Sequence, residues 1–270
     1  VADVSHRRVA GRFADHRRIV DLPVAGVEDV AERRLDEEPV SFRNRVRQRD
    51  VADLERTQLD RSVRLDNVEL DLPGQPLFLE LAGDVLAFMD AKRVTKATVV
   101  GHSMGSFVAQ QVAAAAPGRI ERLVLVGSAT GVRGMNGFTE FQKTVEALQD
   151  PVAEKFAREF QVSTIYRPVQ PVFVDRAVAE SLRLPARVWH ALMAGMAATE
   201  PATVLGKHRI PTLLIWGDRD AVFPRSEQDA LLAMMPSARL KVYEETGHAV
   251  HWERPAEVAR DLEGFVGVGG

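Results

Sequence analysis

The chain has 270 residues, and 46% of them are hydrophobic, which is enough to bury a sizeable core in one large α/β domain or in one domain with an insertion. Its formal net charge of −3 argues against a general role on nucleic acid or on a membrane surface. Cysteine is absent, so disulfides, thiolate metal sites and a cysteine nucleophile are excluded, and a reducing compartment is favoured.

The pattern contains no sign of a membrane span or of a secretory leader. No apolar run approaches the roughly 20 residues that a membrane helix needs. The first residues (VADVSHRRVAGRF) lack the apolar centre of a secretory signal. We therefore expect a cytoplasmic protein that binds neither membrane nor nucleic acid.

The first 75 residues differ in composition from the rest. They contain 14 arginines, no lysine, and 16 aspartates or glutamates. Residues 43–50 (RNRVRQRD), for example, follow neither helical nor strand periodicity. Two hypotheses remain open: the segment is a charged extension without a core of its own, or it is an out-of-frame translation of a GC-rich gene. Peptides sequenced from this region would exclude the second.

From about residue 77 the pattern becomes regular. Apolar residues between positions 79 and 89 recur at helical spacing, and the basic pair Lys92-Arg93 ends the predicted helix. Residues 97–100 form a short β-branched run that predicts a buried strand. The alanine-rich stretch 106–116 predicts a helix, which Pro117-Gly118 closes.

The remaining segments alternate between strand and helix character. Strands are predicted at 123–127, 211–216 and 239–243, and helices at 142–148, 152–160, 177–182, 187–196, 226–235 and from 255 onward. The run 226–229 (SEQD) resembles a capping box that opens its helix. Strands that alternate with helices indicate βαβ units and therefore a mainly parallel sheet.

The most specific motif is Gly101-His102-Ser103-Met104-Gly105, which matches the G-x-S-x-G nucleophile elbow. It lies between a predicted strand and a predicted helix, which is the order that this motif requires. The glycines allow a sharp turn that holds the serine in a strained conformation. The turn also aims the N-terminus of the helix at the serine, where backbone N–H groups favour developing negative charge. Ser103 is thus the predicted nucleophile.

A serine hydroxyl needs an adjacent base, and the base needs an orienting acid. Asp220 follows the strand 211–216, and His248 follows the strand 239–243. The carboxyl ends of parallel strands share one edge of a sheet, so both residues should lie near Ser103. Asp218 is the competing acid and His251 the competing base, although each is better explained by a turn or packing role.

Three motifs carry a family resemblance over about residues 77–266: GHSMG, IPTLLIWGDRDAVFP and ETGHAVHWERP. With them the chain resembles the α/β-hydrolase superfamily. The resemblance implies an α/β fold with a mainly parallel central sheet flanked by helices, its core at 1–131 and 211–270 and a helical cap inserted at 132–210. It also implies Asp220 as the acid, His248 as the base and the Met104 N–H as an oxyanion donor. His102 and Trp189 are either packing residues or contacts to the substrate.

The second donor of an oxyanion site has no visible source. Family members usually supply it from a His-Gly loop, and this sequence contains no His-Gly pair. The family's D-x-x-G-x-G-x-S element is also missing, because Gln75-Pro76 interrupts the opening at 71–74 (DLPG). Losing one oxyanion donor typically slows such reactions by about 10²–10³-fold.

These features predict a serine hydrolase that cleaves small carboxylic esters through an acyl-enzyme on Ser103. Lactonases, carbon–carbon bond hydrolases and perhydrolases of the superfamily use the same triad, and a non-catalytic protein that binds a small ligand is the alternative from another class. No metal-ligand spacing and no nucleotide-binding glycine loop is visible, so no cofactor is expected. The identity of the substrate and the oligomeric state are left open by the sequence.

Overall fold

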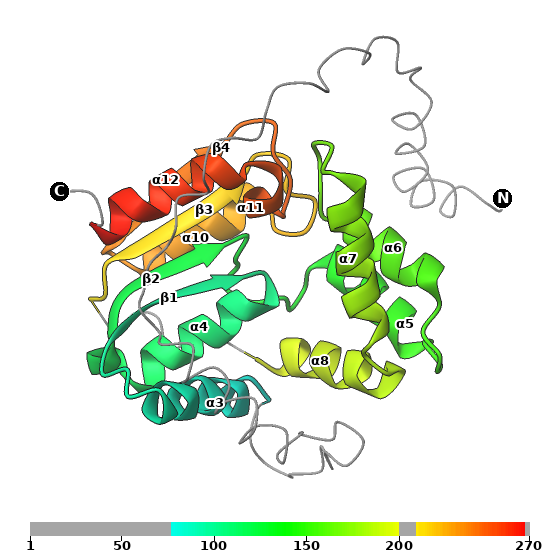
Figure 1. Cartoon of the computed structure of the whole chain (residues 1–270), viewed down its shortest axis with the longest axis horizontal. Coiled ribbons are helices and arrows are strands. Elements are labelled where there is room, and N and C mark those ends of the chain that lie inside the picture. The colour runs from blue at the N-terminus through cyan, green and yellow to red at the C-terminus, as the bar shows by residue number, and fades with distance from the viewer. Residues whose placement is uncertain (1–76, 200–208, 268–270) are drawn as a thin grey trace, which may run out of the picture. The chain divides into compact units, whose positions relative to one another are not determined.

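The computed structural model describes residues 77–199 and 209–267 (Figure 1). The chain divides into two units, residues 1–68 and 69–270, and all described residues belong to the second. The predictions made for residues 1–75, including both hypotheses about their origin, therefore lie outside the described residues.

The centre of the described unit is a sheet of four parallel strands in the order β1-β2-β3-β4. The strands are β1 (Ala97–His102), β2 (Ile120–Val126), β3 (Thr212–Gly217) and β4 (Ala238–Tyr243). Each strand lies beside the next one in the chain, so their carboxyl ends meet at one edge. This confirms the predicted parallel sheet, and it brings the loops after β1, β3 and β4 together.

Helices cover both faces of this sheet. One face packs on α3 (Leu77–Ala91), α4 (Met104–Ala115) and α10 (Arg225–Met234), and the other on α11 (Val250–Glu253) and α12 (Pro255–Val266). In β2, Leu123 and Leu125 belong to the first core, whereas Val124 and Val126 belong to the second. This alternation follows from the period of two in a strand, and it explains why β2 reads as a continuous apolar run. A short 3-10 helix (Pro117–Arg119) joins α4 to β2.

Four helices lie between β2 and β3 in the chain and stand together on one side of the sheet (Figure 1). They are α5 (Asn136–Glu146), α6 (Glu154–Ser163), α7 (Pro171–Leu182) and α8 (Ala186–Ala198). They have an apolar core of their own around Val145, Trp189 and Met193. We call them the inserted helices; all four were predicted, although α5 and α7 begin six residues earlier than expected. In α7 the missed start signal is Pro171 at the first helical turn.

Two local predictions differ from the structure. The capping box at 226–229 is wrong, because α10 begins at Arg225 after Pro224 and its N-cap makes no side-chain hydrogen bond. Glu227 instead accepts hydrogen bonds from the N–H and the hydroxyl of Thr130, at 2.9 and 2.7 Å. Helix α11 was not predicted, since its four residues are too few to show a helical period.

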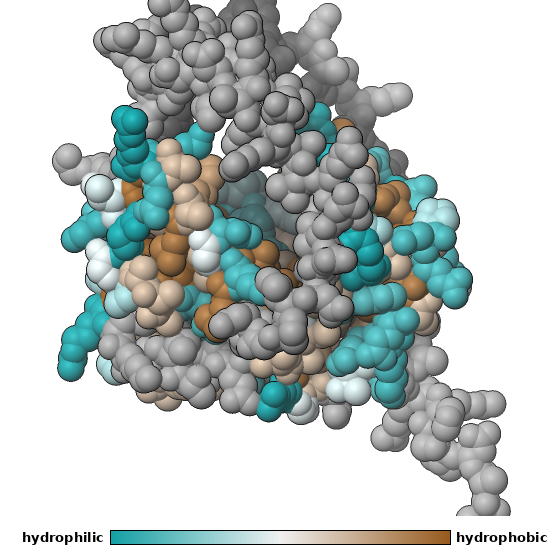
Figure 2. Space-filling model, turned by 90° about the horizontal axis from the view of Figure 1, so that it is seen from below, coloured by the Kyte–Doolittle hydropathy of each residue, from teal (hydrophilic) through white to brown (hydrophobic). Residues whose placement is uncertain are grey.

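The surface seen in Figure 2 mixes hydrophobic and hydrophilic side chains. On α3, Phe78, Ala82 and Met89 are buried, whereas Phe88 is 58% exposed. Single exposed apolar side chains of this kind are normal on a folded domain. Within residues 77–199 and 209–267, no helix has the length and apolar character needed to cross a membrane.

Candidate active site

The predicted nucleophile stands on a sharp turn between β1 and α4. Ser103 has φ 51° and ψ −124°, a sparsely populated positive-φ conformation that costs a non-glycine residue about 1–3 kcal/mol. Its N–H donates to the carbonyl oxygen of Val126 at 3.0 Å, which ties the turn to the end of β2. A Cβ on Gly101 would overlap the backbone of Gly105 and Ser106, so the first glycine of the motif is required. At Gly105 a Cβ would meet nothing within 4 Å, so the second glycine is not needed for space.

Asp220 lies in the loop after β3 and is fully buried at its side chain. Its Oδ1 accepts hydrogen bonds from the N–H groups of Val222 and Phe223, at 2.8 and 2.9 Å. Its Oδ2 lies 2.8 Å from Nδ1 of His248. Asp218 contacts a different group, because its Oδ1 accepts the N–H of Thr246 at 3.4 Å. Of the two competing acids, the structure therefore brings Asp220 to the histidine.

His248 lies in the loop between β4 and α11, with its side chain 2% exposed. The centre of its ring lies 4.9 Å from the ring centre of His102 and 5.4 Å from that of Phe223. Gly127 supplies the space: a Cβ there would stand 2.8 Å from Nδ1 of His248. The Nε2 atom is buried and has no hydrogen-bond partner among the described residues. One nitrogen of the ring thus meets a carboxylate, and the other is available to a reacting group.

His102 connects the elbow to the histidine loop. Its Nε2 lies 3.2 Å from the carbonyl oxygen of His248, and because a carbonyl only accepts, Nε2 carries the proton. Burial is the main cause that lowers the pKa of His102 to about 2, and the charges of His248 and His251 lower it further. His102 is therefore a neutral hydrogen-bond donor to the backbone of residue 248, which favours the packing interpretation of this residue.

His251, the competing base, lies against His102 at 4.5 Å between ring centres. Burial, followed by the charge of His248, lowers the pKa of His251 to about 4. Its Nδ1 is buried and meets no hydrogen-bond partner within the described residues. Since no carboxylate of the described residues is hydrogen-bonded to this ring, His251 lacks a contact like the one that Asp220 makes with His248.

Trp189 lies in the core of the inserted helices. Its indole packs edge-on against Phe156 and Phe160, each with ring centres 5.3 Å away, and the residue is 7% exposed. The structure places Trp189 among these side chains, and the contact of Trp189 with a substrate stays a prediction.

A buried polar network that no sequence motif predicted lies behind the elbow. The Ser106 hydroxyl lies 2.6 Å from the carbonyl oxygen of Ser103 and 2.7 Å from the hydroxyl of Ser128. Gln110 donates to the Ser128 hydroxyl at 2.9 Å, and Gln228 donates to the Ser128 carbonyl at 2.8 Å. Because a hydroxyl carries one proton, Ser128 donates to Ser106 and Ser106 donates to Ser103. The chain of donors holds the carbonyl of the predicted nucleophile.

The Met104 N–H occupies the first position of α4, where a helix leaves its N–H groups without an internal acceptor. An anion beside Ser103 would meet this group and the positive end of the helix dipole. The segment expected to carry a second donor lies outside the described residues. Within the described part of the chain, no group of three or more His, Asp or Glu side chains could hold a metal ion.

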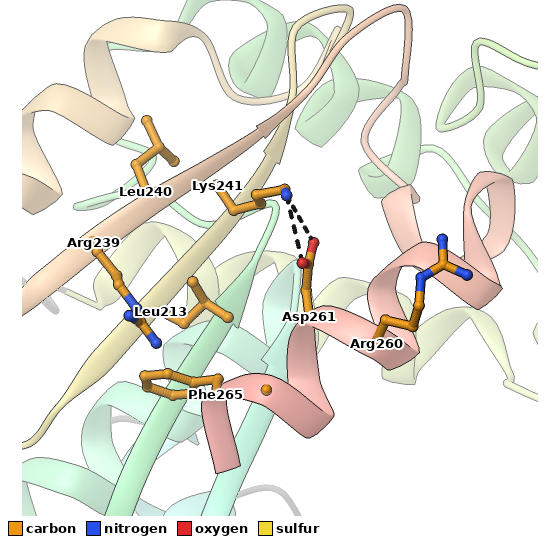
Figure 3. Close-up of a pocket in the computed structure, with 8 residues that line it drawn as sticks. Leu213, Arg239, Leu240, Lys241, Arg260, Asp261 and Phe265 are labelled. Carbon is orange, nitrogen blue, oxygen red and sulfur yellow. Dashed lines mark hydrogen bonds and ion pairs between the residues drawn. The ribbon is translucent and has the colours of Figure 1, made fainter. Parts of the chain in front are cut away.

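A surface pocket between β4 and α12 is unrelated to these groups (Figure 3). Lys241 and Asp261 form an ion pair in it, and Arg239 lies over the ring of Phe265. Its lining contains no serine or histidine. Because Leu213 lies near the start of β3 and Asp220 follows its end, the pocket lies toward the opposite end of the strand.

Comparisons with known proteins match the same part of the chain. The family model described as alpha/beta hydrolase fold matches residues 77–255. A dihydrolipoyllysine-residue acetyltransferase component of the acetoin cleaving system from Pseudomonas putida is 30% identical over 74% of this chain and 55% of its own length. A 2-hydroxy-6-oxononadienedioate/2-hydroxy-6-oxononatrienedioate hydrolase from Cupriavidus pinatubonensis is 28% identical over 70% of this chain and 68% of its own.

A pimeloyl-[acyl-carrier protein] methyl ester esterase from Neisseria meningitidis serogroup C is 28% identical over 72% of this chain and 81% of its own length. The chain thus spans between 55% and 81% of these curated relatives. Among solved structures, a hydrolase from Pseudomonas aeruginosa PA01 superposes with a TM-score of 0.62 at 28% identity, over 72% of this chain and 74% of that one. The matched family model covers most of the described residues and all three motif regions, and the chain belongs to the alpha/beta hydrolase fold family.

Proposed function

We propose that this chain is a serine hydrolase that cleaves small carboxylic esters, with Ser103 as nucleophile, His248 as base and Asp220 as orienting acid. The observation that carries the proposal is the state of His248. Its Nδ1 lies 2.8 Å from Asp220, while its Nε2 is buried and has no partner among the described residues. A histidine oriented in this way, on the same edge of the sheet as a strained serine, is the arrangement that nucleophilic acyl transfer needs.

Asp220 determines which nitrogen of His248 carries the proton. Its Oδ1 is occupied by two backbone N–H groups, so Oδ2 is left to accept the Nδ1–H of the imidazole. The lone pair is then on Nε2, the atom that can take the proton of the Ser103 hydroxyl.

In the reaction, the Ser103 oxygen attacks the acyl carbon of the ester while His248 removes its proton. The negative charge that forms on the carbonyl oxygen is stabilised by the N–H of Met104 at the start of α4. His248 returns the proton to the departing alcohol. Water then attacks the acyl-enzyme with the help of the same base and releases the acid.

In this proposal the inserted helices act as a cap over the acyl group. The side chain of Met104 packs in a cluster with Phe138 of α5 and Met196 of α8. Apolar side chains from the elbow and from two inserted helices therefore lie together. An acyl chain bound at Ser103 would meet this apolar surface, which favours esters of short aliphatic or aromatic acids.

A fluorophosphonate probe, which reacts with activated serines, tests the nucleophile. We expect it to label the wild type and a Ser226→Ala control, whose serine is exposed on α10, and not the Ser103→Ala variant. Folded wild type that stays unlabelled would contradict the proposal. It would support the alternative of a non-catalytic ligand-binding protein, which the missing His-Gly pair favours.

Comparing substrates with different leaving groups distinguishes ester hydrolysis from the other reactions that the same triad could catalyse. A p-nitrophenyl ester, a lactone and a vinylogous diketone would each form an acyl-enzyme on Ser103, and the preferred substrate gives the highest kcat/KM. The hydrolase from Cupriavidus pinatubonensis is named for a keto diacid, which contains no ester, so carbon–carbon bond cleavage is the second candidate. Faster turnover of the diketone than of the ester would favour it.

A further inference from the structure

The loop that carries His248 is bound to the connection between α6 and α7. The N–H of Ala249 donates to the carbonyl oxygen of Thr164 at 3.0 Å. From the other side, the Nε of Arg167 donates to the carbonyl oxygen of Glu245 at 2.9 Å. Residues before and after His248 thus each make a hydrogen bond to the connection between α6 and α7.

Glu253, at the end of α11, joins the same two segments through its side chain. Its Oε1 accepts the N–H of Gly247 at 2.9 Å and the N–H of Tyr166 at 3.1 Å. Its Oε2 accepts the N–H of Arg167 at 2.7 Å. One carboxylate therefore binds the residue next to His248 and two consecutive residues of the inserted segment.

The contact is close at the backbone level. A Cβ on Gly247 would stand 2.7 Å from Oε1 of Glu253 and 2.7 Å from the backbone nitrogen of Tyr166. Only a residue without a side chain leaves room for the carboxylate and the inserted segment together. A movement of Tyr166 would consequently displace Gly247, which is one peptide bond from His248.

The three donors explain why a carboxylate is needed here. An ionised carboxylate accepts at both oxygens, whereas a glutamine side chain of nearly the same shape has one accepting oxygen and one NH₂ group. In a Glu253→Gln variant, the NH₂ group would face either the Arg167 N–H or the pair of N–H groups at Gly247 and Tyr166. At least one of the two segments would lose its acceptor.

We propose that Glu253 is a positioning residue for the base: it fixes the His248 loop and the 166–167 segment to one another, so that His248 is held in place only while the inserted helices are docked. This rests on the proposed function, in which His248 is the base. Glu253 acts through the backbone of Gly247 and touches neither the substrate nor the reacting atoms.

The test compares Glu253→Gln with Glu257→Gln, which removes the same charge four residues later. Glu257 pairs only with Arg254 among the contacts described, at 2.9 Å, and its side chain is 45% exposed. Ester hydrolysis is measured well below the unfolding temperature of both variants. We expect Glu253→Gln to lower kcat by about 10–100-fold with KM within about threefold, as a base displaced by up to about 1 Å would do. Glu257→Gln should keep the wild-type kcat.

Hydrogen exchange supplies a readout of the contact itself. In Glu253→Gln either the Arg167 amide or the Gly247 and Tyr166 amides should lose protection, and in Glu257→Gln all three should keep it. A Glu253→Gln variant with wild-type kcat would overturn the positioning role. An unreactive wild type would overturn the proposed function instead, since the fluorophosphonate probe detects Ser103 without reference to Glu253.

A measurement on the wild type alone covers the case in which Glu253→Gln does not fold. If one carboxylate binds both segments, the three amides should exchange through a single opening with one free energy. Different opening free energies for Gly247 and for Tyr166 would overturn the proposal, because the two segments would then move independently.

Discussion

Replacing Gly127 by alanine is expected to slow ester hydrolysis by about 10–100-fold through the position of His248. The new Cβ would stand 2.8 Å from Nδ1, 2.9 Å from Cε1 and 3.0 Å from the carbonyl oxygen of His248. Carbon and nitrogen atoms in ordinary contact are about 3.5 Å apart, so the imidazole must move by roughly 0.7 Å. That shift strains the 2.8 Å contact with Asp220, and a misplacement of about 1 Å can cost about 10² in rate.

The substitution of Gly127 also strains the backbone, and this conformational cost must be separated from the steric contact with His248. Gly127 has φ 51°, a left-handed conformation that costs alanine about 1–2 kcal/mol, partly offset by the lower entropy of the unfolded chain. Gly134 provides the matched control: its φ is 77°, and a Cβ there would meet nothing within 4 Å. Gly127→Ala and Gly134→Ala should thus share the backbone cost, and only the first should displace His248.

The assays are the fluorophosphonate labelling rate, kcat/KM on a p-nitrophenyl ester, and the unfolding temperature of each variant. We expect Gly134→Ala to retain at least half of the wild-type rate, with Gly127→Ala at least tenfold slower. Equal rates for the two variants would contradict this prediction, because the contact between residue 127 and His248 would then have no effect on the base.

Contacts of Asp220, His251 and Glu227 can be tested in the same way. Asp220→Asn should lower kcat by about 10⁴-fold while the variant stays folded. The amide NH₂ would donate to Nδ1 of His248, so the ring proton would lie on Nε2, which then has no lone pair to accept the serine proton. Activity within tenfold of wild type would contradict this prediction. The pKa of His251 is lowered to about 4, so between pH 6.5 and pH 4 the unfolded chain binds a proton there that the folded chain does not. The free energy of unfolding therefore falls by up to about 1.4 kcal/mol for each pH unit between these values. In urea unfolding, His251→Phe should therefore reduce the stability lost between pH 7 and pH 5 by about 2 kcal/mol, and an unchanged loss would count against the buried neutral histidine. Glu227→Ala should lower the free energy of unfolding by about 2 kcal/mol, or the unfolding temperature by roughly 4–8 °C, because two donors of Thr130 lose their acceptor. A shift under 1 °C would contradict this prediction and show that water replaces the carboxylate.

The parts of the fold and site that the sequence predicted are those with a local signal. Ser103, Asp220 and His248 each follow a strand with a clear apolar pattern, and a parallel sheet brings such loops to one edge. The contact between Asp220 and His248 could be anticipated because it connects two positions in recognisable motifs.

The network behind the elbow could not be predicted in the same way. Ser106 pairs with a residue 22 positions away, and Gln228 donates to Ser128 across 100 positions. In the sequence Ser106 stands beside an apolar run and Gln228 stands between Glu227 and Asp229, which is how exposed positions also look. The role of Glu253 was hidden for a similar reason, since its three partners are backbone groups and carry no side-chain pattern.

The loop after β2 contributes no side chain to the proposed reaction. Its Gly127 leaves the space that the ring of His248 occupies. That same loop leads directly into α5, so the four inserted helices follow the one strand of the described sheet whose carboxyl end carries none of the proposed reactive groups. An exchange of these helices for those of a related protein would leave the strands under Ser103, Asp220 and His248 intact. Under the proposed function, we expect such an exchange to change substrate preference and to keep the reaction, provided that the new segment offers two N–H donors to Glu253, as Tyr166 and Arg167 do.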